Sequence, residues 1–150
     1  MILLDTNVVS EPLRLSPHPG VVTWLDAQHP ATLYLSAISV AEIRYGIASL
    51  PVGKRRTTLA DRFERDVLPV FDVRILSFDE PAADHYAAMR AEMRSRGRAI
   101  GDLDAMIAAI ALSRRLTIST RDTTPFLDAG LKVINPFNGA ELTSRQSHPS

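Results

Sequence analysis

The chain of 150 residues contains no cysteine, only one tryptophan and no net charge. The lack of cysteine excludes disulfide bonds, thiolate metal ligands and a thiol nucleophile, and it is compatible with a reducing compartment. No window approaches the ~18 uninterrupted apolar residues of a membrane span, and no signal-peptide pattern opens the sequence. We therefore expect a soluble, cytoplasmic protein that makes no contact with a membrane.

Charge and length set further bounds. Because 17 basic residues are matched by 17 acidic residues, the overall charge gives no support for a nucleic-acid partner. With 45% hydrophobic residues, the chain is long enough for one domain with a substantial core and too short for two. We expect that domain at residues 1–140, followed by a polar, disordered tail at residues 141–150.

Apolar runs typical of strands alternate with helical patterns along the chain. Strands are predicted at residues 2–4, 33–35, 73–76, 116–119 and 132–134. Helical periodicity is found between them, at residues 8–13, 21–28, 39–51, 52–69, 79–96 and 102–115. Strands separated by helices predict a parallel sheet with helices packed on its faces, and ligands of such sheets bind beyond the carboxyl ends of the strands.

Four acidic residues lie at the ends of these predicted elements. Asp5 follows the first strand, Asp122 follows the fourth, and Glu42 and Asp104 stand near the starts of helices. If they converge, they form a cluster of oxygen ligands, which favours Mg²⁺ or Mn²⁺ over zinc. The reaction that such a site suggests is metal-assisted hydrolysis of a phosphodiester.

Each acid also has an ordinary structural explanation. Ser39 and Glu42 have the spacing of a capping box, and Asp104 is a common residue for the first turn of a helix. Asp122 is suited to starting a turn, and Asp5 is suited to capping the next helix. The pattern alone therefore leaves both interpretations open for each residue.

Five segments, taken together and in order, resemble the PIN-domain ribonucleases. They are residues 2–7, 39–46, 104–111, 120–122 and 135–137. The similarity spans about residues 1–137, and within that family it is to the VapC toxins of bacterial toxin–antitoxin pairs, especially the FitB-like branch. The resemblance implies a three-layer α/β/α sandwich around a central, mainly parallel five-stranded sheet.

The resemblance also implies a metal site with one or two Mg²⁺ or Mn²⁺ ions. Asp5 and Asp104 match its primary ligands, and Glu42 either completes the ligand set or accepts a proton. Asp122 departs from the pattern, because related chains often carry an asparagine at that position; it either supplies the fourth carboxylate or orients a water molecule. The remaining matched polar residues, Thr6, Asn7 and Thr120, are expected to support the ligands.

The activity implied is that of a toxin that hydrolyses RNA with a metal-activated water. The partners implied are RNA, a cognate antitoxin and a second copy of the chain, in a homodimer or in a heterotetramer or larger complex with antitoxin. Operator DNA is expected to be bound only through the antitoxin. One alternative is a corepressor that acts mainly by binding the antitoxin. A phosphatase is another, but residues 5–7 lack the Asp-x-Asp signature that it needs.

Basic residues are clustered although the total charge is balanced. Five lie in one predicted helix: Lys54, Arg55, Arg56, Arg62 and Arg65. A second group, around Arg94 and Arg98, precedes the helix of Asp104, and Arg121 stands beside Asp122. We expect Arg94, Arg98 and Arg121 to contact substrate phosphates. For the first cluster, a solvated helix face with interspersed acids remains an open alternative.

Overall fold

A six-stranded sheet forms the centre of the computed structural model, which describes residues 1–145. The strands are β1 (Ile2–Leu4), β2 (Leu33–Ser36), β3 (Ile75–Leu76), β4 (Thr117–Ser119), β5 (Val133–Ile134) and β6 (Leu142–Thr143). Their order across the sheet is β3-β2-β1-β4-β5-β6, and every pairing is parallel except that of β5 with β6. The predicted parallel sheet of five strands is confirmed, and a short antiparallel strand is added to it.

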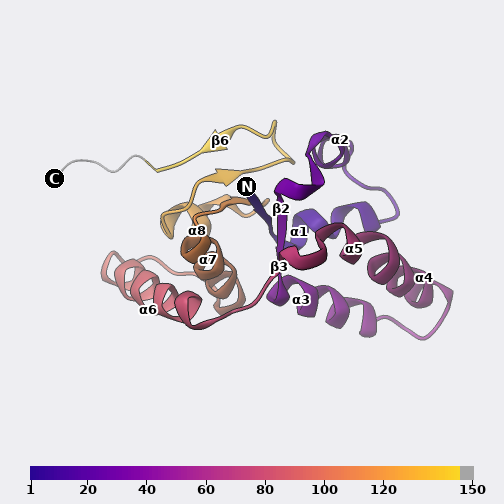
Figure 1. The fold of residues 1–150 in the computed structure, drawn as a ribbon, viewed down its shortest axis with the longest axis horizontal. Helices are drawn as coiled ribbons and strands as arrows, with labels where there is room; N and C mark the ends of the chain where they lie inside the picture. Colours follow the sequence, from indigo (N-terminus) through magenta and orange to yellow (C-terminus); the bar gives the residue numbers. More distant parts are fainter. Residues whose placement is uncertain (146–150) are drawn as a thin grey trace.

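Eight α-helices connect and cover the strands (Figure 1). They are α1 (Thr6–Val9), α2 (Pro19–Ala27), α3 (Ala37–Ala48), α4 (Lys54–Arg62), α5 (Leu68–Phe71), α6 (Glu80–Ser95), α7 (Asp102–Arg114) and α8 (Thr123–Asp128). Short 3₁₀ turns occupy Glu11–Leu13, Pro30–Thr32 and Asp72–Arg74, and a π turn at Phe63–Val67 joins α4 to α5.

Two helical segments differ from the sequence prediction. The single helix expected at residues 52–69 is divided by the π turn at Phe63–Val67, which buries Phe63 completely. Helix α8 was not predicted, because its Asp-Thr-Thr-Pro start is also typical of a turn. Local sequence preferences therefore located most helices but not their interruptions.

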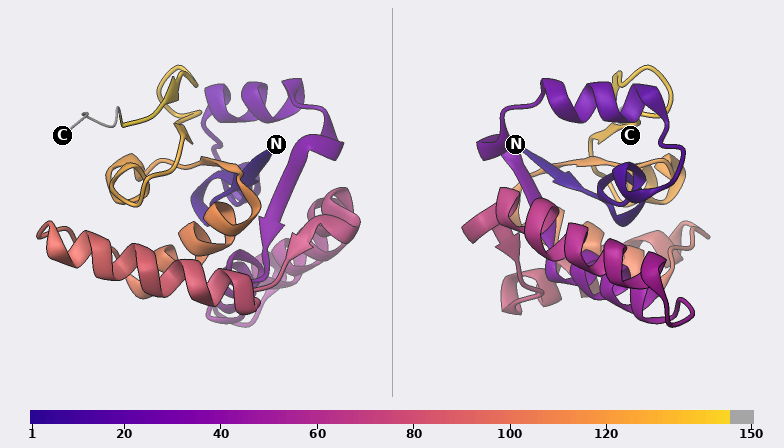
Figure 2. Two further views of the ribbon diagram at one scale, coloured as in Figure 1. Left: turned by 60° about the vertical axis from the view of Figure 1, so that its left-hand side comes forward. Right: turned by 90° about the vertical axis from the view of Figure 1, so that its right-hand side faces the viewer.

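The side chains of β1 show how the three layers are built. Leu3 packs into a core with helices α6, α7 and α8, whereas Leu4 packs into a second core with α1, α3 and α4. Successive side chains of a strand point to opposite faces of the sheet, so the strand separates two helical layers. Figures 1 and 2 show these layers, with α6 lying along α7 on one side and α3 and α4 on the other.

Helix α7 is apolar almost all round, as predicted, and positions the acids at its start. Most residues of the helix body, including Ala105, Ile107 and Ile110, are buried between the sheet and α6, whereas Asp102 and Leu103 are exposed. Burial of the helix body fixes the place of its first turn, where Asp104 lies. Among the helices formed by residues 1–145, none is both long and apolar enough to cross a membrane.

The C-terminal segment extends beyond the expected domain boundary at residue 140. Leu142–Thr143 pair with β5, and the Arg145 guanidinium forms an ion pair with the buried carboxylate of Asp128 at the end of α8. Part of the segment expected as a disordered tail is thus held by backbone pairing and an ion pair. Residues 146–150, the rest of that segment, lie outside the described part of the chain.

Candidate active site

Asp5 lies at the centre of a polar network at the carboxyl edge of the sheet. Its Oδ1 accepts a hydrogen bond from the backbone N–H of Thr6 at 2.8 Å, so it caps helix α1. Its Oδ2 accepts hydrogen bonds from the Thr120 hydroxyl at 2.8 Å and the Asn7 amide at 3.3 Å. Only 3% of the residue is exposed. Asp5 therefore caps helix α1 and belongs to the candidate site at the same time.

Thr6, which lies 36 positions earlier in the sequence, connects Glu42 to this network. The Thr6 hydroxyl lies 2.8 Å from Glu42 Oε1 and 2.9 Å from the Ser39 hydroxyl. The helix begins at Ala37, and its cap is Ser36, whose Oγ accepts the Ser39 N–H at 3.0 Å. The capping-box interpretation of Ser39 and Glu42 is therefore wrong: β2 ends at Ser36, so the helix starts three residues earlier and Glu42 lies in its second turn.

The cap at Ser36 gives a prediction about stability. Replacing Ser36 with Ala should lower the free energy of unfolding by about 1–2 kcal/mol, because the buried N–H of Ser39 loses its acceptor. Urea denaturation measures the change. Ser49, an exposed residue at the end of the same helix, provides the control. Its replacement by Ala should change stability by no more than about 0.5 kcal/mol, and an equal effect at the two positions would contradict this account.

Asp104 and Asp122 complete the acidic edge. Asp104 lies in the first turn of α7 and is half-buried; its burial raises the pKa, and the negative charges of Glu42 and Asp122 raise it further. Asp122 is exposed, and its Oδ2 accepts a hydrogen bond from the Asn7 amide at 3.3 Å. Its backbone N–H donates to the Thr120 hydroxyl at 3.0 Å. Asn7 and Thr120 thus connect Asp122 with Asp5.

Electrostatic effects among these carboxyl groups follow from their closeness. Burial raises the pKa of Asp5 from 3.8 to about 6, and the charges of Asp104 and Glu42 add to the increase, while the hydrogen bonds from Thr120 and Thr6 oppose it. A carboxyl group in this position is costly to ionise unless positive charge is supplied nearby. The site therefore has the electrostatic character of a cation-binding site.

The donor chemistry fits a hard divalent cation. The side chains at this edge offer carboxylate, hydroxyl and amide oxygens, which Mg²⁺ and Mn²⁺ prefer, and no cysteine is present. Within residues 1–145, no three His, Cys, Asp or Glu side chains lie close enough together to hold a metal ion between them. The hydroxyl of Thr6 instead donates to Glu42, the hydroxyl of Thr120 to Asp5, and the amide of Asn7 to both Asp5 and Asp122.

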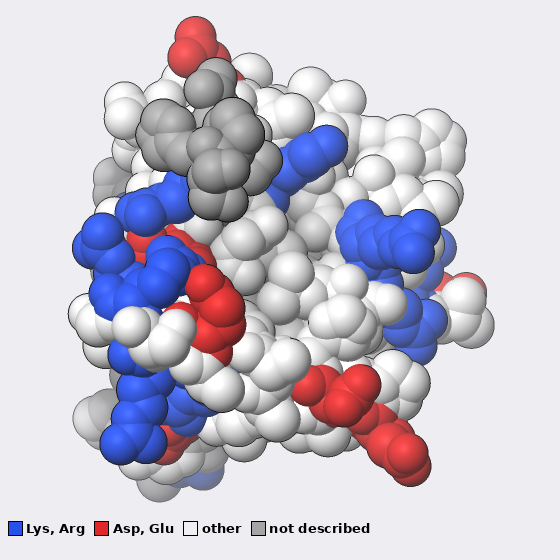
Figure 3. All heavy atoms as spheres, turned by 90° about the vertical axis from the view of Figure 1, so that its left-hand side faces the viewer, with Lys and Arg blue, Asp and Glu red and all other residues white. Residues whose placement is uncertain are grey.

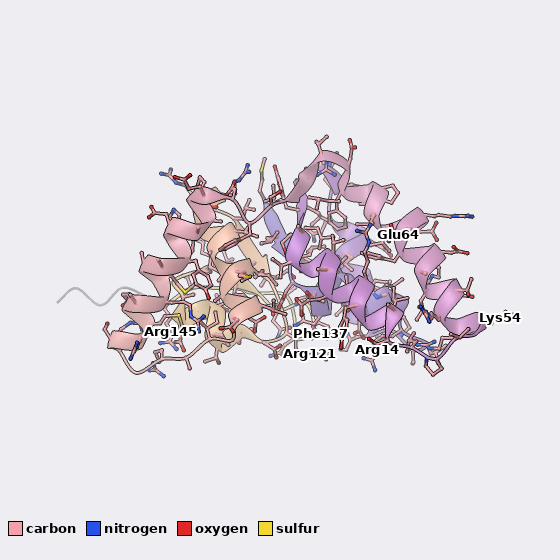
Figure 4. The ribbon with its side chains drawn as sticks, turned by 90° about the horizontal axis from the view of Figure 1, so that it is seen from below. Arg14, Lys54, Glu64, Arg121, Phe137 and Arg145 are labelled. Carbon is pink, nitrogen blue, oxygen red and sulfur yellow. The ribbon has the colours of Figure 1, made fainter. Side chains whose placement is uncertain are left out.

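Arg121 lies next to the acidic edge and is held by an aromatic ring. Its guanidinium carbon is 3.8 Å from the centre of the Phe137 ring, a close cation–π contact, and its backbone N–H donates to Asn7 Oδ1 at 3.1 Å. Figure 4 shows Arg121 and Phe137 together, with Arg14 nearby along the same side of the view. The side chain of Arg121 is exposed, and its guanidinium stacks on the Phe137 ring.

Arg94 and Arg98 occupy a different place from Arg121. Together with Arg90 they line a hollow of about 380 Å³ between α6 and the segment that leads to α7. Arg90 is engaged by Asp102 at 2.8 Å, whereas the side chains of Arg94 and Arg98 form no ion pair or hydrogen bond within residues 1–145. Figure 3 shows that Lys and Arg side chains gather in separate areas of this face of the molecule. A contact of Arg94 and Arg98 with phosphate stays a prediction.

The serines of the β2–α3 junction were the part of the network that the sequence did not reveal. Ser36 and Ser39 are fully buried and hydrogen-bonded to each other. The Thr6 hydroxyl connects Ser39 with Glu42. A possible signal was present, because Ser36 directly follows the apolar run at residues 33–35, which is a favoured place for a helix cap.

Comparison with known proteins identifies relatives over nearly the whole chain. Residues 2–130 match the family described as the PIN domain. The chain is 54% identical over 137 residues to the plasmid stability protein StbB of Pseudomonas syringae pv. tomato, covering 91% of this chain and 99% of StbB. It is 49% identical to the VapC ribonuclease Y4jK of Sinorhizobium fredii, covering 93% and 100% of the two chains. It is also 49% identical to the toxin FitB of Neisseria gonorrhoeae, covering 92% and 99%.

Solved structures share the fold. The crystal structure of FitAcB from Neisseria gonorrhoeae matches with a TM-score of 0.89 and 49% identity, covering 92% of this chain and 99% of the other. The structure of FitAB bound to the IR36 DNA fragment matches with a TM-score of 0.89 and 48% identity, covering 92% and 96%.

Fold and site together define an α/β/α domain with acidic side chains at the carboxyl edge of its parallel strands. The chain belongs to the PIN-domain family, within the branch that contains the VapC and FitB toxins. The resemblance predicted from the five sequence segments is thereby confirmed.

Proposed function

We propose that this chain is a Mg²⁺- or Mn²⁺-dependent endoribonuclease and the toxin of a toxin–antitoxin pair. The observation that carries the proposal is the buried carboxyl group of Asp5, whose pKa is raised to about 6 beside Asp104 and Glu42. A bound cation stabilises such a group of acids, and pKa values shifted in this way are typical of functional sites. The relative named VapC ribonuclease supports RNA as the substrate, and the relative named toxin FitB supports the role of a toxin.

The metal would be held by Asp5 and Asp104, with Glu42 completing the ligand set or accepting a proton from the attacking water, and with Asp122 as a further oxygen donor. Because no three acids of the described chain lie close enough together in this structure to hold an ion, these side chains would have to turn toward the ion when it binds. When bound, a divalent cation neutralises these carboxylates, lowers the pKa of a water molecule and offsets the charge that develops on the phosphate. Asp122 is the weakest member of this set, because it is exposed and related chains often have an amide there.

The chain's own residues have separate roles in this proposal. Thr120 and Asn7 fix the orientation of the Asp5 carboxylate, and Thr6 fixes that of Glu42. Arg121, oriented by Phe137, binds a phosphate of the substrate. No covalent intermediate with the protein is required.

The test of this function is cleavage of RNA by purified, antitoxin-free protein. Labelled single-stranded RNA is incubated with the protein in Mg²⁺, in Mn²⁺ and in excess chelator. We expect internal cleavage with either cation and loss of cleavage, by at least about a hundredfold, when the cation is removed. Cleavage that continues unchanged in chelator would show that the proposed metal dependence is wrong.

A second candidate function is that of a corepressor, which the structure of FitAB bound to a DNA fragment favours. In this role the chain would bind a cognate antitoxin, as part of a heterotetramer or larger complex, and the antitoxin would contact operator DNA. The two functions make different predictions for an Asp104→Asn variant. A corepressor should retain full DNA binding in the complex with antitoxin, whereas ribonuclease activity of the free variant should be lost.

A further inference from the structure

A groove leaves the acidic edge in the direction of α4. Its first part is a hollow of about 300 Å³, lined by Thr6 and Glu42, by apolar side chains that include Ile43 and Leu59, and by Arg14 and Arg55. Because Thr6 and Glu42 also belong to the candidate active site, the hollow opens directly from it. A ligand bound at the acids would therefore extend into this space.

The groove continues into a second hollow, of about 550 Å³. The two hollows share Leu13, Arg14, Arg55 and Leu59, so they adjoin each other. The second adds Lys54 and Arg62. We call this feature the basic groove, and it is defined by its four cations, Arg14, Lys54, Arg55 and Arg62. Of the acidic residues in the described chain, only Glu42 lines either hollow, at the end that meets the active site.

Charge is segregated around α4 and the π turn that follows it. The cations Lys54, Arg55 and Arg62 line the groove, whereas the acids Asp61 and Glu64 line neither hollow. Glu64 is turned to α3, where it pairs with Arg44 at 2.8 Å. Figure 4 shows Glu64 well apart from Arg14 and Lys54. A merely solvated helix face is expected to mix the two signs, so the segregation favours an anionic ligand.

The placement of the cations also opposes a purely structural role. Lys54 and Arg55 stand in the first turn of α4, which has no acidic residue and no side-chain cap. Positive charge at the N-terminus of a helix interacts unfavourably with the helix dipole. Neither side chain forms a hydrogen bond or ion pair with another side chain in residues 1–145. Arg14 and Arg62, by contrast, are oriented by Glu11 and by the carbonyl of Pro12.

We propose that the basic groove binds the single-stranded RNA segment that adjoins the scissile phosphate, an inference that rests on the proposed ribonuclease function. The four cations contact the phosphates, and the apolar floor formed by Ile43, Ile47 and Leu59 receives a base of the segment next to the site. A positively charged groove that follows the phosphates is the usual arrangement for single-stranded nucleic acid, and here aliphatic side chains take the place of the aromatic ones on which bases usually stack. The groove thus determines the affinity for RNA, whereas the acidic residues of the active site carry out the cleavage.

The test measures RNA binding separately from cleavage. In an Asp104→Asn background, which is expected to bind without cutting, the affinity for a 12-nucleotide single-stranded RNA is measured by fluorescence anisotropy across a range of salt. Replacing both Lys54 and Arg55 with Ala should weaken binding by about tenfold at physiological salt and reduce the slope of log K against log[salt] by about 0.7 for each lost contact. With Asp104 intact, the double variant should show a higher KM for the same RNA and an unchanged kcat.

The matched control is Arg56→Ala with Arg65→Ala, which removes the same charge from the same helical run at positions that line neither hollow. It should change both the affinity and the salt slope by much less. Equal effects of the two double variants would mean that the groove has no specific role and that only net charge matters.

Two further outcomes separate the groove from the function itself. If the wild-type protein cleaves RNA while the Lys54, Arg55 double variant retains its affinity, salt slope and KM, the groove proposal is wrong and the ribonuclease function stands. If that variant binds RNA normally but has lost affinity for a cognate antitoxin, the groove is a protein-binding surface, which also overturns the proposal. If neither the wild-type protein nor a variant with Asp104 intact cleaves RNA, the proposed ribonuclease function is wrong. The anisotropy measurement still decides whether the groove binds RNA.

Discussion

Replacing Asp104 with Asn is expected to reduce RNA cleavage by at least about a hundredfold while leaving the fold intact. The amide keeps the size of the side chain but removes the negative charge through which Asp104 would hold the metal. Burial and the charges of Glu42 and Asp122 raise the pKa of Asp104, so loss of its charge should not destabilise the fold. The lost interaction with the N-terminus of α7 amounts to only about 0.5 kcal/mol. Initial rates of cleavage with Mn²⁺ and with Mg²⁺ measure the effect.

Asp102 provides a closely matched control for this experiment. It lies two residues earlier in the same helix, but its carboxylate is exposed and pairs with Arg90 at 2.8 Å. Asp102→Asn should therefore leave cleavage within about threefold of wild type, since loss of such an exposed pair changes stability by no more than about 1 kcal/mol. Similar losses in the two variants would indicate a general effect of charge at the start of α7, and retained activity in Asp104→Asn would remove Asp104 from the site.

The second large effect concerns the stability of the metal-free protein. Burial raises the pKa of Asp5 to about 6, so the folded protein binds this proton more tightly than the unfolded chain does. The resulting contribution to stability is present in full below about pH 4 and is lost as the pH rises through about 6. Raising the pKa from 3.8 to about 6 corresponds to about 3 kcal/mol. Above pH 7 the folded protein therefore carries an unfavourable buried charge.

Asp5→Asn removes that charge and should stabilise the metal-free protein at pH 7.5. We expect a net gain of about 1–2 kcal/mol, because the amide nitrogen accepts neither of the hydrogen bonds that Thr120 and Asn7 donate to Oδ2, a loss of about 1–2 kcal/mol. Chemical denaturation from pH 4 to pH 8 should show the advantage shrinking below pH 6 and disappearing near pH 4. A variant less stable than wild type at every pH would contradict the assigned pKa.

A divalent cation should make the wild-type protein more stable than the Asp5→Asn variant. Added Mn²⁺ should raise the Tm of the wild-type protein, since a ligand that binds only the folded state stabilises it, and should have little effect on Asp5→Asn. The same change at Asp5 is expected to abolish cleavage. A variant that is more stable without metal, unresponsive to metal and inactive would show that Asp5 is retained for function at a cost in stability.

Local patterns were sufficient for most of the fold. Apolar runs at residues 2–4 and 33–35 are strands, and the long apolar stretch after Asp104 is a buried helix, because burial on one or both faces leaves a clear periodicity in the sequence. Parallel strands bring their carboxyl ends to one edge, so Asp5 and Asp122 were expected near each other, and Asn7 does connect them. The break of the predicted helix at Phe63–Val67 was not foreseen, because it depends on how Phe63 enters the core.

The sequence by itself therefore determined the alternation of strands and helices and which acids lie at the carboxyl edge of the sheet, because these follow from periodicity and topology. It determined the family through the five segments that resemble the PIN-domain ribonucleases. Only the tertiary structure decided that Thr6 bonds Glu42 across 36 positions and that Ser36 caps α3 in place of Ser39. It also decided that Lys54, Arg55 and Arg62 line the groove while Glu64 pairs with Arg44 of α3. These features depend on contacts between segments distant in sequence, whose partners leave no signal in the local pattern of either segment.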